Sequence, residues 1–255
     1  VTKVKVSDVT APAKPVVNQV TDKMDTVSGM AEANSIVTVY KGKVELGKTT
    51  AGKDGKYSVK IAKHKAGTEL SVTATDSAGN TSSTTKVTVA DVTAPAKPKL
   101  KTSLSNNTTK LEGTAEAFST VSVKAGKKTW TTKVDKKGKF KLTISKQKAG
   151  TKVTIWATDA AKNKSQSLTV TVKDKIAPAA PKVLPTWSFQ KKLSGMAEPG
   201  ATITVKYKNK VIAVAKANKL GYFKARINYN KGVVLTVTAT DAAKNTSKAT
   251  KVKLR

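Results

Sequence analysis

Nine carboxylates recur at three fixed places along the chain, and carboxylate oxygens are ligands that Ca²⁺ prefers in proteins. Each third of the chain has one acid in a proline-bearing segment, one in an Ala-Glu motif and one in an Ala-Thr-Asp motif. In the last third these three are the only acids, set among 17 Lys and Arg residues. The candidate Ca²⁺ ligands are three sets: Asp8, Glu32 and Asp76; Asp91, Glu116 and Asp159; Asp174, Glu198 and Asp241.

The same acids have a second interpretation, which stays open. An aspartate in a turn accepts hydrogen bonds from main-chain amides, so Asp76 and its equivalents would cap a loop without binding metal. The glutamates would likewise satisfy loop amides or pair with a lysine.

Lysine is the other residue type whose number and distribution indicate a binding function. The chain has 46 Lys, two Arg and 16 acids, for a formal net charge of +32. Residues 8–90 have 11 Lys and 8 acids (+3), residues 91–173 have 18 Lys and 5 acids (+13), and residues 174–255 have 17 Lys and Arg and 3 acids (+14). Self-repulsion of this size weakens a compact state. The asymmetry therefore predicts a polyanionic partner for the last two segments.

Many of these cations fall where a strand would face water. In residues 139–144, 203–208 and 222–227 apolar side chains alternate with polar or charged ones, so we expect the cations of these segments, Lys206 and Lys208 included, to point outward from a strand. Lysine is a hydrated point charge that suits diffuse attraction to phosphate. We expect teichoic acid as the partner; DNA, sulfated glycans and a merely solubilising surface are the alternatives. The candidate polyanion contacts are Lys124, Lys127, Lys128, Lys136, Lys137, Lys139, Lys141, Lys206, Lys208, Lys224 and Arg226.

One aromatic residue is a candidate for sugar binding. Trp156 occupies the polar phase of residues 153–157, so we expect it to face outward, where it would stack on a sugar ring or cover apolar surface between domains. The remaining composition argues against an enzyme. The chain has no Cys, and His64 is its single His, which excludes thiolate chemistry and His-pair metal motifs and disfavours a Ser-His-Asp hydrolase.

The elements that position these residues come in three copies. Pro12, Pro95 and Pro178 open Ala-Pro-x-x-Pro segments that lie 83 residues apart (95 − 12 and 178 − 95). A period this long predicts one independent small domain per copy. We expect residues 1–7 to be the end of a preceding repeat or a linker. Repeats 1, 2 and 3 then span residues 8–90, 91–173 and 174–255.

Within a copy, apolar and polar residues alternate at period two, as in residues 36–40, 57–61 and 70–74. About seven short strands joined by turns predict an all-β sandwich. With the strands named A to G, the Ala-Glu motif forms the B–C loop and the Ala-Thr-Asp motif opens the F–G loop. Both loops lie at the end where the linker aspartate enters. Short proline-bearing linkers and mutual repulsion predict that the three sandwiches form an extended rod.

The order of these motifs resembles the tandem bacterial immunoglobulin-like (Ig-like) repeats of large surface adhesins and exported Gram-positive proteins. The matching motifs are Asp-x-Thr-Ala-Pro-x-x-Pro, Gly-x-Ala-Glu-x-x-Ser-x-Val-x-Val, Asp-x-Gly-x-Tyr/Phe and Val-Thr-Ala-Thr-Asp-x-Ala-x-Asn. The resemblance covers the whole chain and implies three Ig-like β-sandwiches outside the cell. In that family such repeats build stalks, present an adhesive domain or attach an exported enzyme to the surface. Some members carry calcium at junctions between domains.

These features predict a non-catalytic, monomeric extracellular module at the cell wall or cell surface. It would attach a secreted or surface protein to anionic cell-wall polymers through repeats 2 and 3. The alternative is a calcium-stiffened adhesin stalk, or a module that binds extracellular DNA or host polyanions. No apolar run approaches the roughly 18 residues of a membrane span, so we expect no membrane insertion. A catalytic domain upstream in a longer parent protein is compatible with both hypotheses.

Overall fold

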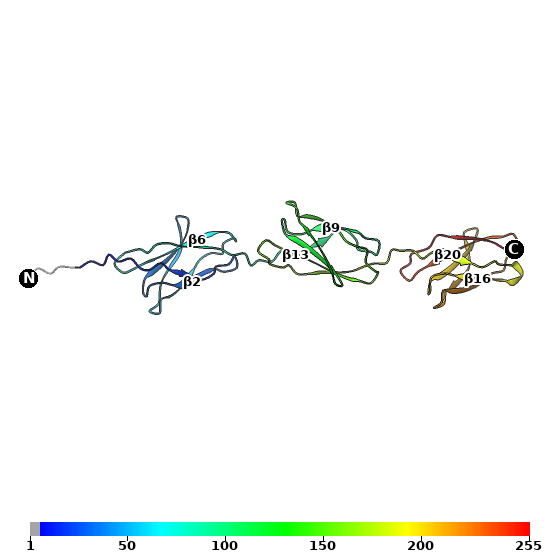
Figure 1. Cartoon of the computed structure of the whole chain (residues 1–255), viewed down its shortest axis with the longest axis horizontal. Helices are drawn as coiled ribbons and strands as arrows, with labels where there is room; N and C mark the ends of the chain where they lie inside the picture. Colours follow the sequence, from blue (N-terminus) through cyan, green and yellow to red (C-terminus); the bar gives the residue numbers. More distant parts are fainter. Residues whose placement is uncertain (1–5) are drawn as a thin grey trace, which may run out of the picture. The chain divides into compact units, whose positions relative to one another are not determined.

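Each of the three repeats forms an all-β sandwich of two antiparallel sheets (Figure 1). The computed structural model describes residues 6–255, so residues 1–5 of the expected end of a preceding repeat, or linker, lie outside the described residues. In repeat 1 the three-stranded sheet has the order β1-β2-β5 and the four-stranded sheet the order β4-β3-β6-β7. Its strands are β1 (Val16–Val17), β2 (Thr26–Met30), β3 (Ile36–Lys41), β4 (Val44–Thr50), β5 (Lys56–Lys60), β6 (Glu69–Thr75) and β7 (Thr85–Thr88).

Repeats 2 and 3 have the same sheet orders. The strands of repeat 2 are β8 (Lys99–Leu100), β9 (Lys110–Thr114), β10 (Thr120–Ala125), β11 (Lys128–Lys133), β12 (Lys139–Thr143), β13 (Lys152–Thr158) and β14 (Leu168–Thr171). Those of repeat 3 are β15 (Lys182–Val183), β16 (Lys192–Met196), β17 (Thr202–Tyr207), β18 (Lys210–Lys216), β19 (Tyr222–Arg226), β20 (Val234–Thr240) and β21 (Thr250–Lys253). A 3₁₀ turn, η1 (Ser188–Gln190), precedes β16. No helix within residues 6–255 is long and apolar enough to span a membrane.

The alternation of the strands explains why these segments pack into sandwiches. In β6, Leu70, Val72 and Ala74 are fully buried, while Ser71 and Thr73 between them are half-buried on the outer side of the sheet. A strand places successive side chains on opposite faces, so a period of two lines one face with apolar groups. The strands expected at residues 36–40, 57–61 and 70–74 are confirmed to within one residue at each end.

Each terminal repeat has its own hydrophobic core. In repeat 1 it is built around Val27, Val39 and Val72, and in repeat 3 around Ile203 and Val237. At one position in each three-stranded sheet a glycine allows the short first strand to approach closely. The three equivalent glycines are Gly29, Gly113 and Gly195, and a Cβ on any of them would overlap a main-chain carbonyl oxygen of the neighbouring strand.

Candidate functional site

The F–G loop aspartates cap a turn. Asp76 Oδ1 accepts hydrogen bonds from the main-chain nitrogens of Ala78 and Asn80, each at 2.9 Å, and Asp76 Oδ2 accepts one from Asn80 Nδ2 at 2.9 Å. These bonds, first among them the one from the Asn80 side chain, lower the pKa of Asp76. The Asp–Asn pair recurs in the other repeats as Asp159 with Asn163 and Asp241 with Asn245.

The linker aspartates bond to their own segment. Asp8 Oδ1 accepts a hydrogen bond from Thr10 N at 2.9 Å, and Asp91 and Asp174 accept the same bond from the residue two positions on. The linker meets the F–G loop through an asparagine, because Asn80 Nδ2 donates to the main-chain oxygen of Asp8 at 3.1 Å. The two loops therefore come together through an amide and a carbonyl rather than through two carboxylates.

The three carboxylates of a repeat do not form a calcium site in this structure. Within residues 6–255 no group of three or more His, Cys, Asp or Glu side chains is placed to hold a metal ion. At least one oxygen of each candidate aspartate already accepts an N–H donor, and both oxygens do so in the F–G loop aspartates. The B–C loop is closed by a main-chain bond, in which Glu32 O accepts from Ser35 N at 3.1 Å. The geometry thus favours turn-capping over calcium for the aspartates.

The cations of the three repeats differ in how many are paired with acids. Repeat 1 has three ion pairs in the described residues: Lys48 with Glu45, Lys56 with Asp54, and Lys86 with Glu69. Repeat 2 has one, between Lys141 Nζ and Glu112 at 3.2 Å, and none joins residues of repeat 3 within residues 6–255. The unneutralised positive charge therefore increases along the chain.

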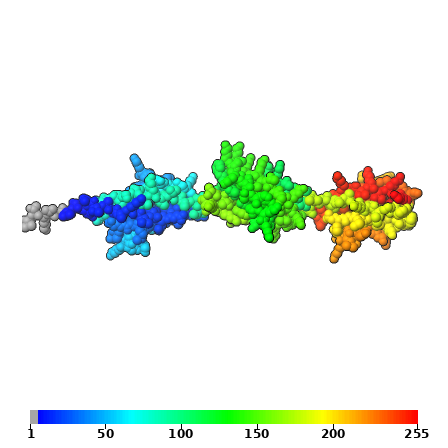
Figure 2. Space-filling view, viewed as in Figure 1, coloured from blue at the N-terminus to red at the C-terminus, as the bar shows by residue number. Residues whose placement is uncertain are grey.

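The seven candidate lysines of repeat 2 are all exposed, on strands and turns of its sandwich. In the space-filling view, part of this repeat, drawn in green, projects beyond the body of the domain (Figure 2). Lys141 differs from the other six because Glu112 pairs with it, so it is less available to an external anion.

The prediction for Lys208 was wrong in one respect. It was expected on a strand face, but β17 ends at Tyr207, and Lys208 and Asn209 form the following turn with φ of 44° and 65°. Two successive residues with positive φ are the mark of a tight hairpin whose twist matches its strands. Lys206, at a register shift in β17, is half-buried rather than fully exposed. Lys224 and Arg226 lie exposed on β19, as expected.

Repeat 3 places two cations directly opposite each other in a β-ladder. Lys192 on β16 pairs with Arg226 on β19, and Lys224 on β19 pairs with Ser194. Directly opposed side chains have Cβ atoms about 4.5–5.5 Å apart, and like charges at this spacing are destabilising. The positions equivalent to Lys192 and Arg226 hold fewer cations in the other repeats: Thr26 with Lys60 in repeat 1, and Lys110 with Thr143 in repeat 2.

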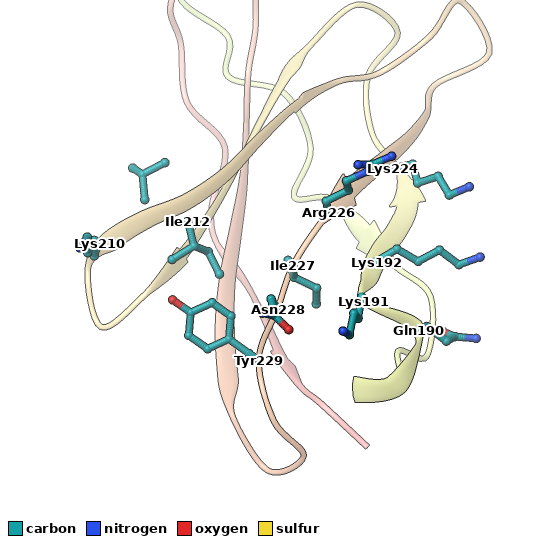
Figure 3. A pocket seen from close by; sticks show the side chains of 11 residues that line it. Gln190, Lys191, Lys192, Lys210, Ile212, Lys224, Arg226, Ile227, Asn228 and Tyr229 are labelled. Carbon is teal, nitrogen blue, oxygen red and sulfur yellow. The ribbon is translucent and has the colours of Figure 1, made fainter.

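Lys192, Lys224 and Arg226 border a hollow of about 980 Å³ between the edge of β18 and the outer side of β19. We call it the basic hollow and define it by Lys191, Lys192, Lys210, Lys224, Arg226 and Tyr229. Figure 3 shows Lys192 and Lys224 extending in the same direction from their strands. Sequence reasoning missed Lys191, Lys192, Lys210 and Tyr229. A comparison of the three repeats by strand register would have found the lysines, because Asp25 and Thr26 replace the first two in repeat 1.

Trp156 lies on the outer side of β13, between buried Ile155 and Ala157, and is half-buried. Lys164 Nζ stands over its ring, 4.2 Å from the centroid. Such a cation–π contact is worth about 0.5–1 kcal/mol at an exposed site. A sugar would have to displace Lys164 from that ring face in order to stack there.

The chain matches the family model described as a bacterial Ig domain three times, at residues 11–91, 94–174 and 177–255. It belongs to the bacterial Ig domain family. The three matches are consecutive and together take in nearly all of the chain, so these domains are tandem repeats of one fold.

Among curated proteins, the chain is similar to a cell wall-associated protease of Bacillus subtilis (strain 168). The two are 32% identical over 158 residues, which make up 62% of this chain and 17% of the protease. The chain thus spans less than a fifth of the length of the relative it matches.

Among solved structures, the bacterial Ig repeats are similar to part of a 1.5-MDa bacterial ice-binding adhesin, with 20% identity, a TM-score of 0.33 and coverage of 90% of this chain and 91% of that one. A Ca²⁺-stabilised, ice-binding adhesin of an Antarctic bacterium gives 20% identity, a TM-score of 0.33 and coverage of 97% and 74%. Similarity at this level carries no argument about function.

Proposed function

We propose that these bacterial Ig repeats are a non-catalytic module at the cell wall or cell surface. The module attaches a secreted or surface protein to anionic cell-wall polymers, with teichoic acid as the partner, through repeats 2 and 3. The name of the Bacillus relative, a cell wall-associated protease, supports this location. We extend the proposal to a parent protein in which the repeats hold an exported enzyme at the wall.

The observation that carries the proposal is the difference in charge between repeats of one fold. The net charge rises from +3 in repeat 1 (11 Lys, 8 acids) to +13 and +14 in repeats 2 and 3. Ion pairs fall from three to one to none over the same repeats in the described residues. A fold that tolerates +3 needs no further charge for solubility, so the added cations point to an anionic partner.

Among polyanions, lysine is best suited to bind polymers that have a phosphate group in each unit. A flexible polymer with a phosphate in each unit releases condensed counterions when cations bind it, and this release supplies the affinity without a shaped pocket. The exposed lysines of repeat 2, spread over strands and turns, fit such diffuse contact. Extracellular DNA offers the same phosphates and is therefore the competitor to be tested.

The test is binding of the full chain to purified Gram-positive cell walls before and after removal of teichoic acid, with duplex DNA as competitor. We expect stripped walls to lose the protein, and DNA to compete only in proportion to its phosphate content. Undiminished binding to stripped walls would contradict the proposal. If DNA competed much more strongly than its phosphate content predicts, nucleic acid rather than teichoic acid would be the partner.

A further inference from the structure

We propose that the basic hollow of repeat 3 is an oriented seat for the phosphodiester groups of a polyol-phosphate chain. This inference deepens the proposed function and rests on it: diffuse attraction by repeats 2 and 3 brings the polymer in, and the basic hollow fixes its register. Lys192, Lys224 and Arg226 bind the phosphates. Tyr229 lines the same hollow, on the side away from the ends of Lys192 and Lys224, where it would border the carbon skeleton of the chain (Figure 3).

The first argument is the unneutralised ladder pair. Lys192 and Arg226 stand directly opposite each other, with Lys224 two residues before Arg226 on the same face. Opposed like charges destabilise a sheet, and an anion between them converts the repulsion into attraction. The three acids of repeat 3 lie in the linker, the B–C loop and the F–G loop, and no ion pair links them to this face within residues 6–255.

The second argument is comparison with the equivalent positions, which act as an internal control. Where repeat 3 has Lys224 opposite Ser194, repeat 2 has Lys141 opposite Glu112 in an ion pair. Repeat 1 has two serines there, Ser28 and Ser58. Lys191 also has an acidic equivalent in repeat 1. Ile227 N donates a hydrogen bond to Lys191 O, and in repeat 1 the equivalent bond runs from Ile61 N to Asp25 O. The same fold is thus complete without these cations.

The third argument is the choice of arginine. The chain has 46 Lys and only two Arg, and one of these is Arg226 in the basic hollow. The guanidinium is a planar fork that matches two phosphate oxygens at once, whereas lysine offers a single point charge. In repeat 1 the equivalent residue is Lys60.

The shape of the hollow favours a polyol phosphate over a nucleic acid. Tyr229 lines the hollow, packs on the core and meets the ring of Tyr207 at a centroid distance of 5.0 Å. Because the ring of Tyr207 and the core cover part of Tyr229, Tyr229 is a side wall of the hollow rather than an open platform for stacked bases. Five cations around a hollow of about 980 Å³ leave room for more than one phosphate.

The probe is a defined glycerol-phosphate oligomer of four units, titrated into the full chain and followed by calorimetry and by amide chemical shifts. The first variant is Lys192→Thr with Lys224→Ser, which installs the residues of repeat 1. The matched control is Lys216→Thr with Lys248→Ser. The control removes the same charge from exposed sites of repeat 3 outside the basic hollow. It also introduces the equivalent residues of repeat 1, which are Thr50 for Lys216 and Ser83 for Lys248.

We expect the first variant to lose at least about tenfold in affinity for the oligomer, the scale of one charge-assisted hydrogen bond. The control should lose less than about threefold, as for exposed, screened charges. A third variant, Arg226→Lys, keeps the net charge and should still weaken binding by about threefold or more, because the fork is lost. Shift changes in the wild type should centre on β16 and β19.

The outcomes separate the two proposals. If the wild type binds oligomer and walls, but the first variant and its control behave alike and Arg226→Lys has no effect, the basic hollow is not a seat and diffuse attachment stands. If the wild type binds neither oligomer nor walls, the proposed function fails and this inference fails with it. Inorganic phosphate binding as tightly as the oligomer, or a four-phosphate oligothymidylate binding more tightly, would overturn the assignment to a polyol chain.

Discussion

The charge on repeat 2 should account for a measurable share of the salt dependence of wall binding. The perturbation is neutralisation of five exposed lysines, Lys124, Lys128, Lys136, Lys137 and Lys139, to glutamine. Each phosphate contact contributes about 0.7 to the slope of log affinity against log salt for a flexible strand, so five lost contacts lower the slope by about 3.5. Over a fourfold rise in salt, the wild type should lose about a hundredfold more affinity than the variant.

The assay is sedimentation of the full chain with purified walls at several salt concentrations. The matched control neutralises five exposed lysines of repeat 1: Lys23, Lys41, Lys53, Lys63 and Lys65. Both variants have a net charge of +27 (32 − 5), so any difference between them reports where the charge stands rather than how much there is. None of the ten side chains forms an ion pair within the described residues, and circular dichroism should show both variants folded.

Equal changes of slope in the two variants would refute the reasoning, since binding would then follow net charge alone. Binding by the wild type that is insensitive to salt would refute it in another way. It would indicate a shaped pocket, with Trp156 beneath Lys164 as the first residue to test.

Three further predictions concern stability and metal. Gly195→Ala should destabilise repeat 3 by about 1–3 kcal/mol, because the new Cβ would overlap the carbonyl oxygen of Lys182; hydrogen exchange of that repeat would measure the loss. Hydrogen bonds, first that from Asn80, hold the pKa of Asp76 below its ordinary value of 3.8, so their stabilisation is complete above that pH and is lost as the pH falls through the lowered pKa. Asp76→Ala should therefore flatten the acid limb of an unfolding titration of repeat 1, and an unchanged limb would contradict the capping role. Millimolar Ca²⁺ should leave the melting temperature equal to that in EDTA, whereas a site that binds only the native state would raise stability by about 2.7 kcal/mol at a hundredfold excess of ligand.

The sandwiches could be predicted because their signal is local. The alternation of apolar and polar residues within 70–74 is enough to predict which side chains are buried. Leu70, Val72 and Ala74 are buried as that pattern requires. Recurring Asp and Asn residues also indicate where the loops of the bacterial Ig repeats lie. The hydrogen bonds by which Ala78 and Asn80 engage both carboxylate oxygens of Asp76 depend on the loop geometry, which alternation does not indicate.

The site was less predictable, because it depends on which strands are neighbours. Lys192 and Arg226 are 34 residues apart (226 − 192), and only the register of β16 with β19 sets them opposite each other. Alternation indicates that each faces outward but not what each faces. Lys208 illustrates the opposite error, since the alternation of β17 was extended past Tyr207 into a turn.

The outer face of a sandwich can change its charge without changing its fold, and this is why one fold can have a net charge of +3 in repeat 1 and +14 in repeat 3. Along β16 and β19 the buried positions, such as Leu193 and Phe223, are apolar, as are Leu111 and Phe140 in repeat 2. The outward positions between them contact solvent, so substitutions there leave the core intact. Cations added at such positions still repel one another, and repeat 3 has no ion pair within the described residues to offset that repulsion. The proposed anionic polymer would neutralise these charges on the folded face and not on the unfolded chain in the same arrangement. Under that proposal, binding should restore the stability that the added charge removes, most strongly where the cations are opposed in the ladder.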